Sequence, residues 1–227
     1  MSMGPSDERG PRHEGSRPPG RGRPPGAGPT GEPKLDLALA ALRLKDVPRA
    51  GWTMHGIEAP ESVADHSYGT ALLCLLYAAD AGVDQARAVA IALAHDLAEA
   101  VTGDFANRAA DSDRPFREAE KAAAERAAMD ALVPPAADAV RELWLEYEER
   151  SSAEAVFVRD MNLIDMSLQA LAYEEWRRYD HTVPIPSAGG HTHLDEFFVS
   201  AEARLATPLG RRLYAAIERR YRAVRRA

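Results

Sequence analysis

The run Ala94-His95-Asp96-Leu97-Ala98-Glu99-Ala100-Val101-Thr102-Gly103-Asp104 places a histidine-aspartate pair inside an apolar helical pattern. Apolar residues before and within the run predict that the helix is buried. Ionised groups resist transfer into a protein interior unless a partner compensates for the lost hydration. A cation is such a partner, since imidazole and carboxylate groups suit divalent metals. The run therefore predicts a metal site carried by an interior helix.

The spacing of the polar residues predicts which side chains share this site. His95 and Glu99 are four residues apart, so on a continuous helix from Asp84 to about Ala100 they lie on one face, with Asp96 turned about 100° away. His66 lies upstream, one turn into a helix predicted from Ser62 to about Ala79. We predict that His66, His95 and Asp96 hold one catalytic cation.

Composition limits the class of protein. The 227 residues are enough for one domain with a sizeable core, and a formal net charge of -7 argues against general nucleic-acid binding. The one cysteine, Cys74, excludes an internal disulfide framework. No apolar run is long enough to span a membrane, and the N-terminus lacks the apolar core of a signal peptide. These features predict a cytoplasmic protein without a membrane partner.

The chain divides into two parts. Residues 1–33 are rich in Gly, Pro and Arg, which predicts a disordered tail, and residues 34–227 form the predicted domain. The domain shows helical periodicity and no alternating strand pattern, so we predict an all-α bundle. Its helices are predicted at 35–42, 62–79, 84–100, from about 115 to 132, from 134–135 onward, at 152–179 and from 207 to the end.

Two motifs of the chain resemble a known family. Glu61-Ser-Val-Ala-Asp-His66-Ser and the run from His95 to Asp104 are similar to the HD-domain metal-dependent phosphohydrolases. The likeness is greatest to the branch with the bacterial 5'-deoxynucleotidases and their eukaryotic HD-domain relatives, and it extends from about Leu35 to Gly210. It implies an HD-domain helical bundle in which His66, His95 and Asp96 bind a metal. Glu99 and Asp104 are then used in catalysis.

The resemblance also implies a reaction and its partners. A 5'-deoxynucleotidase-like phosphohydrolase hydrolyses nucleoside 5'-monophosphates, here deoxyribo- or modified ones, to nucleoside and phosphate. The cofactor is then a divalent cation, with Mn, Co, Zn, Fe and Mg all left open, and the protein is a homodimer. Two other classes stay open: a non-catalytic nucleotide-binding HD protein and a di-iron HD oxygenase. Metal content and nucleotide binding distinguish them.

The chain departs from the family pattern at the distal metal ligand. The family sequence there is close to Lys-Asp-Leu-Asp-Lys, and its second Asp binds metal; register through Gln169-Ala170 places Asn162 at that position. An amide oxygen can bind a cation but brings no charge. We predict Asn162 as a direct or water-mediated ligand, and we leave open Asp165, or no fourth protein ligand.

A second departure concerns the substrate. The bacterial enzymes carry an Arg-Trp pair, implicated in sugar recognition, at the positions of Gly51 and Trp52. Trp52 keeps the aromatic residue, whereas the arginine is lost and Arg49 is the nearest base. We predict Trp52 and Arg49 as substrate-binding residues, and we leave open that Trp52 is a packing residue.

Overall fold

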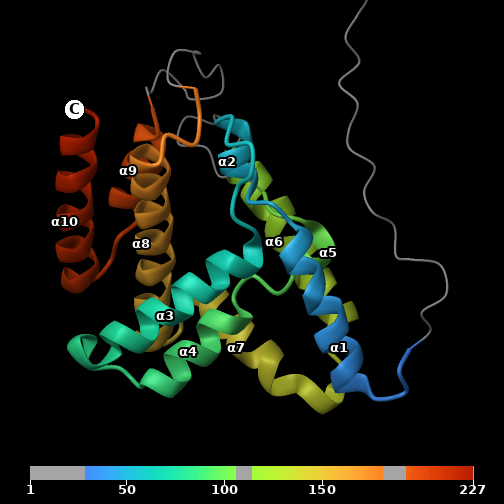
Figure 1. Ribbon diagram of the computed structural model, residues 1–227. Helices are drawn as coiled ribbons and strands as arrows, with labels where there is room; N and C mark the ends of the chain where they lie inside the picture. The colour runs from blue at the N-terminus through green and yellow to red at the C-terminus, as the bar shows by residue number, and fades with distance from the viewer. Residues whose placement is uncertain (1–28, 106–113, 181–192, 227) are drawn as a thin grey trace, which may run out of the picture.

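The computed structural model describes residues 29–105, 114–180 and 193–226, with side chains after the first gap described from residue 118 (Figure 1). Within these ranges every regular element is a helix, and the one β-type pairing is an isolated bridge between Pro48 and Ser62. The predicted all-α fold is confirmed. None of the helices in the described ranges is long and apolar enough to cross a membrane.

The helices follow one another with short connections. In chain order they are α1 (Pro33–Ala41), the 3-10 helix η1 (Leu42–Asp46), α2 (Ala50–Met54), α3 (Val63–Ala81), α4 (Gln85–Ala94), α5 (Glu99–Thr102), α6 (Arg114–Leu132), the 3-10 helix η2 (Pro135–Ala137), α7 (Asp138–Glu149), α8 (Ala153–Glu175), α9 (Asp195–Glu202) and α10 (Pro208–Val224).

Local sequence accounts for most helix starts. Ser62 and Asp65 form a capping box at the start of α3, in which each side chain bonds the other residue's backbone amide. The side chains of Asp84, Ser152 and Thr207 cap α4, α8 and α10, each accepting from one backbone N–H. The predicted tail lies mostly outside the described residues, and α1 already begins at Pro33.

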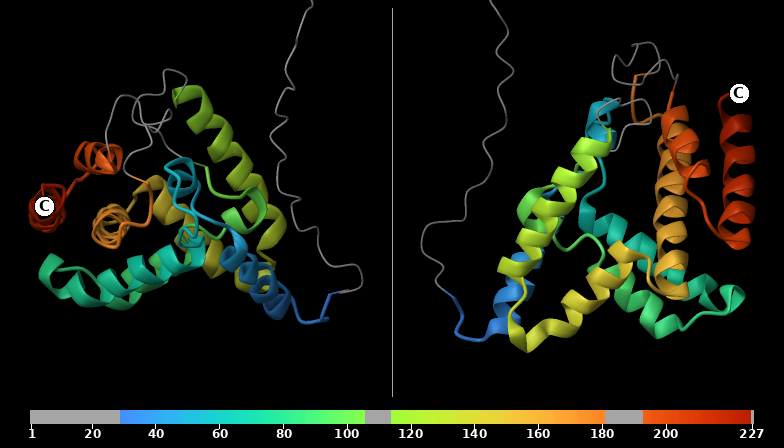
Figure 2. Two further views of the ribbon diagram at one scale, coloured as in Figure 1. Left: turned by 45° about the horizontal axis from the view of Figure 1, so that its top comes forward. Right: turned by 180° about the vertical axis from the view of Figure 1, so that it is seen from behind.

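Two apolar clusters form the interior. The main cluster joins α3, α4, α8, α9 and α10, and includes Cys74, Ile91, Phe157, Met161, Ile164, Phe198 and Tyr221. The side cluster joins η1, α5, α6 and α7, and includes Leu44, Leu97, Ala98, Ala100, Met129 and Trp144. Figures 1 and 2 agree that α9 and α10 lie along α8 on the side away from α1 and α6. The two clusters therefore lie on different sides of the bundle.

The predicted continuous helix from Asp84 to Ala100 is wrong. α4 ends at Ala94, residues 95–98 form turns, and a separate short helix α5 begins at Glu99. Ile91 packs in the main cluster, whereas Leu97 packs in the side cluster. One straight helix cannot direct Ile91 into the main cluster and Leu97 into the side cluster. The chain therefore changes direction at His95.

Two short helices were missed by the sequence prediction. The five-residue α2 is too short for a periodic pattern, and α9 falls where a polar loop was expected. The α9 region does carry an apolar repeat at Leu194, Phe198 and Ala201, all buried. The long helix α8 also ends at Glu175, four residues before the predicted end. α2 and α9 both matter, because each lines the pocket described next.

Candidate metal centre and substrate pocket

Three predicted ligands converge at the point where α4 ends. His66 comes from the first turn of α3, and His95 and Asp96 come from the turn between α4 and α5. The Asp96 Oδ2 atom lies 3.1 Å from His95 Nε2 and 3.8 Å from His66 Nε2. The three ligand atoms all lie within 4.8 Å of one another. The break in the helix allows this, since on a straight helix Asp96 turns away from His95.

The outer nitrogen of each histidine is already bonded. His66 Nδ1 lies 2.7 Å from Asp165 Oδ2, and His95 Nδ1 donates to the Ala92 carbonyl at 2.7 Å. In the neutral rings that a metal requires, these bonds leave both Nε2 atoms as lone-pair nitrogens directed toward Asp96. Metal-binding histidines are commonly oriented in this way.

The inward atoms of the trio have no hydrogen-bond partner. In the described part of the chain, His66 Nε2, His95 Nε2 and Asp96 Oδ2 are all buried without one. Such atoms are costly unless something else satisfies them. A divalent cation does so with two imidazole nitrogens and a carboxylate oxygen. The donor set therefore fits a metal.

The protonation states also fit. Burial, reinforced by the Arg49 guanidinium, lowers the pKa of His66 to about 3, so its ring is neutral. Burial disfavours ionisation of Asp96, but His95 and Arg49 outweigh it and hold the pKa of Asp96 far below its usual value. Metal ligands must be neutral imidazole and ionised carboxylate.

The structure separates the two candidates for the distal ligand. Asn162 lines the same pocket as His95 and Asp96, and its Nδ2 donates to the Tyr147 hydroxyl at 2.9 Å. Asp165 instead lies on the Nδ1 side of His66, away from the converging Nε2 atoms. Asp165 is thus placed to orient His66, and Asn162 is placed at the cavity.

A glycine makes room for Asp165. An added Cβ at Gly69 would lie 2.0 Å from Asp165 Oδ1, closer than two non-bonded atoms can approach. We therefore expect Gly69→Ala to displace Asp165 from His66 and to weaken metal binding by roughly 10- to 100-fold, the usual loss for an outer-shell partner. Metal titration measures this. In an Asp165→Ala background the added methyl meets no carboxylate, so Gly69→Ala should then have no further effect; a further loss there would contradict the steric explanation.

The two predicted catalytic acids occupy different surroundings. Glu99 is 1% exposed, and burial together with Asp96 and Asp104 raises its pKa to about 10. A cation at the trio opposes that shift, because a nearby positive charge favours the ionised carboxylate. Glu99 Oε1 lies 3.6 Å from Lys121 Nζ, and among the described residues Oε2 has no hydrogen-bond partner. Glu99 is thus a buried acid beside the candidate ligands.

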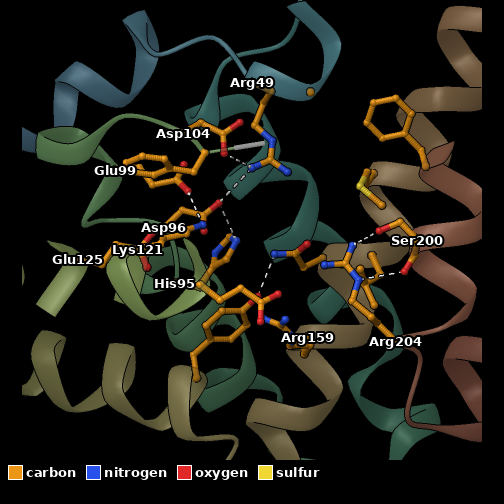
Figure 3. Close-up of a pocket in the computed structure, with 18 of the residues that line it drawn as sticks. Arg49, His95, Asp96, Glu99, Asp104, Lys121, Glu125, Arg159, Ser200 and Arg204 are labelled. Carbon is orange, nitrogen blue, oxygen red and sulfur yellow. Dashed lines mark hydrogen bonds and ion pairs between the residues drawn. The ribbon is translucent and has the colours of Figure 1, made fainter. Parts of the chain in front are cut away.

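Asp104 is held on both oxygens. Its Oδ2 accepts from the Ala50 backbone N–H at 2.7 Å, and its Oδ1 accepts from Arg49 Nη1 at 3.4 Å. The same Arg49 nitrogen lies 3.7 Å from Asp96 Oδ2. Figure 3 shows Arg49 reaching toward the acids from the opposite side to His95. Asp104 therefore joins the α5 segment to the start of α2 and fixes Arg49 over the site.

The surrounding cavity has a volume of about 440 Å³. Trp52 lines it but is only 1% exposed: its ring stacks on Phe197 at 3.9 Å, and its Nε1 donates to Glu61 at 2.8 Å. A Cβ at Gly51 would lie 3.1 Å from the Phe197 ring, so Phe197 fills the space beside the lost arginine position. Trp52 is therefore mainly a packing residue at the edge of the cavity, and the Phe197 ring covers its indole ring.

Sequence reasoning missed several residues of this pocket. They are Lys121, Glu125, Tyr147, Arg159, Phe197, Ser200 and Arg204. Figure 3 shows Ser200 and Arg204 across the pocket from His95 and Asp96, where Arg204 Nη2 donates to Ser200 Oγ at 2.7 Å. These residues come from α6, α7, α8, α9 and the turn after α9, and no local motif links them to the His95 segment.

Known proteins resemble the chain in sequence and fold. The HD domain family model matches residues 41–197. The 5'-deoxynucleotidase HDDC2 of Xenopus laevis is 41% identical over 149 residues, which are 64% of this chain and 71% of that protein. HDDC2 of Danio rerio is 38% identical over 170 residues, 73% of this chain and 76% of that protein.

A solved structure shows the same arrangement of helices. The PH0347 protein from Pyrococcus horikoshii OT3 aligns with a TM-score of 0.61 and 32% sequence identity, covering 83% of this chain and 98% of that chain. The segment matched by the HD domain family model, residues 41–197, contains the converging trio His66, His95 and Asp96, together with Glu99 and Asp104. By motif, fold and overall similarity, the chain belongs to the HD domain family, within the group that includes the relatives named 5'-deoxynucleotidase HDDC2.

Proposed function

We propose that the protein is a metal-dependent phosphomonoesterase that hydrolyses nucleoside 5'-monophosphates to nucleoside and phosphate. The observation that carries the proposal is the set of three buried atoms without hydrogen-bond partners, next to the buried acid Glu99. The relatives from Xenopus laevis and Danio rerio are named 5'-deoxynucleotidases, which supports the same reaction class. Metal-assisted hydrolysis requires both parts, a cation site and a proton-accepting group beside it.

His66, His95 and Asp96 are the proposed metal ligands, and Asn162 completes the site directly or through a water. When bound by these residues, a divalent cation would supply Lewis acidity toward a phosphoryl oxygen and would lower the pKa of a water. Mn, Co, Zn, Fe and Mg all stay open. Nitrogen and oxygen donors without thiolate are compatible with each of these metals to a different degree.

The chain's own residues supply the proton transfer and the positioning. Glu99 orients the attacking water and accepts a proton from it as the new P–O bond forms. The bond between phosphorus and the nucleoside O5' breaks, and the leaving oxygen takes up the proton that Glu99 accepted from the water. The Arg49 guanidinium, held by Asp104, faces the phosphate and stabilises its growing negative charge. The catalytic role predicted for Asp104 is thus to place Arg49.

Phosphate release tests this function. We expect the metal-loaded protein to release inorganic phosphate from at least one member of a panel of ribo-, deoxyribo- and modified nucleoside 5'-monophosphates. Release from none of them would contradict the proposal. Two irons per chain would instead favour a di-iron oxygenase, and nucleotide binding without metal or turnover would favour a binding protein. Calorimetry and metal analysis of the same preparation distinguish these outcomes.

Asn162 supports a prediction specific to this chain. We expect Asn162→Asp to tighten metal binding about tenfold, which corresponds to about 1.4 kcal/mol, because a carboxylate adds charge to the site. The contact with Tyr147 survives, since a hydroxyl can donate to a carboxylate as readily as it accepts from an amide. Metal titrations of wild type, Asn162→Asp and Asp165→Ala check this. Unchanged affinity in the first and collapse in the last would make Asp165 the ligand.

An apolar stripe on α3 supports the proposed homodimer. Tyr68, Leu72 and Leu76 follow one another at four-residue intervals and are exposed, and Trp176, directly after the neighbouring α8, is 63% exposed. Soluble monomers rarely expose such continuous apolar surface. We expect light scattering to report a dimer that Leu76→Asp converts to monomer. Leu35→Asp, a change at an exposed leucine on α1, should leave the dimer intact; equal effects would argue against this surface.

Three expectations from composition stay predictions. They are the cytoplasmic location, the absence of a nucleic-acid partner and the separate character of residues 1–33. Each rests on the charge and residue content of the chain rather than on the arrangement of its helices.

A further inference from the structure

A lysine from α6 reaches the acid proposed as the catalytic base. Lys121 Nζ lies 3.6 Å from Glu99 Oε1 and 3.3 Å from Glu125 Oε1, and its side chain is largely buried. Figure 3 shows Lys121 and Glu125 beside Glu99 on one side of the pocket. The three side chains form a carboxylate–ammonium–carboxylate row that joins α5 to α6.

The choice of lysine stands out in this chain. The sequence holds 28 basic residues, and three of them are lysines, at positions 34, 45 and 121. Lys45 is exposed, whereas Lys121 lines the cavity. An ammonium is a compact charge that can approach one carboxylate oxygen without the wide planar fork of a guanidinium. This suits a position between two carboxylates in a tight space.

The surroundings keep Lys121 charged. Burial opposes its charge, but Glu125, Glu99 and the other acids of the site outweigh burial and raise the pKa of Lys121 above its ordinary value. A charged ammonium between two buried carboxylates restricts the orientation of both. Because Lys121 contacts Oε1, Glu99 Oε2 is the carboxylate oxygen that is buried without a hydrogen-bond partner among the described residues.

We propose that Lys121 is a positioning residue for hydrolysis, which holds the Glu99 carboxylate so that Oε2 faces the attacking water. Glu125, one turn along α6, fixes the ammonium from its other side. This inference rests on the proposed function, because it assigns Glu99 its role in that reaction. The competing role for a lysine in a phosphatase pocket is direct contact with the substrate phosphate, and the two roles affect different kinetic constants.

The test uses steady-state kinetics of the metal-loaded protein. Misplacing a reacting group by about 1 Å can lower turnover by about 100-fold. We therefore expect Lys121→Met to lower kcat by about 10- to 100-fold, with KM nearly unchanged, metal content retained and the protein still folded at the assay temperature. Lys121→Arg should recover part of kcat, since it keeps the charge. Lys45→Met is the matched control and should behave as wild type.

A double-mutant cycle with Glu99→Gln decides whether Lys121 acts through Glu99. Groups that act as one unit do not have additive effects, so Lys121→Met should lower kcat no further in the Glu99→Gln background. Full multiplication of the two effects would overturn the proposal, as would a raised KM with unchanged kcat. If wild type itself releases no phosphate, the proposed function has failed. If wild type is active and Lys121→Met keeps the same kcat, this inference alone has failed.

Discussion

His95→Ala is expected to leave a folded protein that neither retains a divalent cation nor releases phosphate. The ring is 2% exposed and its Nε2 faces Asp96 at 3.1 Å, so its removal deletes a ligand from the centre of the trio. The loss of metal affinity should exceed the roughly 10- to 100-fold typical of an outer-shell partner. Metal analysis after dialysis and a phosphate-release assay measure both losses.

The melting temperature provides an independent measure of the same site. A ligand that binds only the folded state raises the free energy of unfolding. The increase grows with the logarithm of the ratio of ligand concentration to Kd. Wild type should therefore melt at a higher temperature when metal is added, whereas His95→Ala should show no such rise. His193→Asn, a change at a histidine that contacts Glu174 outside the pocket, is the control and should keep the metal response. A metal response in His95→Ala would remove His95 from the ligand set.

Glu99→Gln is expected to abolish most turnover while the metal stays bound. The substitution keeps the shape of the side chain and removes its ability to accept a proton, and general-base catalysis typically contributes 10²- to 10⁴-fold. We therefore expect kcat to fall by about that factor with little change in KM. Stability should not fall, because a neutral amide replaces an acid buried close to Asp96 and Asp104.

Two outcomes would contradict this role for Glu99. Retained kcat would mean that another group accepts the proton, and loss of metal together with kcat would make Glu99 a ligand. Metal analysis of Glu99→Gln separates these cases from the expected one. Ser67→Ala, a change at a small buried polar residue of α3 next to His66, should keep both metal and turnover, and it controls for a general effect of mutation near the site.

The sequence alone was sufficient for the fold class and for the three side chains that converge in the candidate site. Apolar periodicity and capping residues such as Ser62 and Asp84 predicted most helices, because these signals act within a few residues of one another. The motif of His66, His95 and Asp96 predicted the trio because its residue types have few other uses in a buried segment. The register at Asn162 likewise followed from sequence, and the structure places that side chain at the cavity.

Only the tertiary structure decided how these residues meet. Local periodicity favoured one straight helix through His95, but packing against two separate apolar clusters bends the chain there and brings Asp96 back toward both histidines. Asp165, left open as a ligand by the sequence, lies beside the outer nitrogen of His66. Lys121, like Arg49, meets the site across elements far apart in sequence. Contacts of this kind depend on how helices pack, and no local pattern encodes that packing.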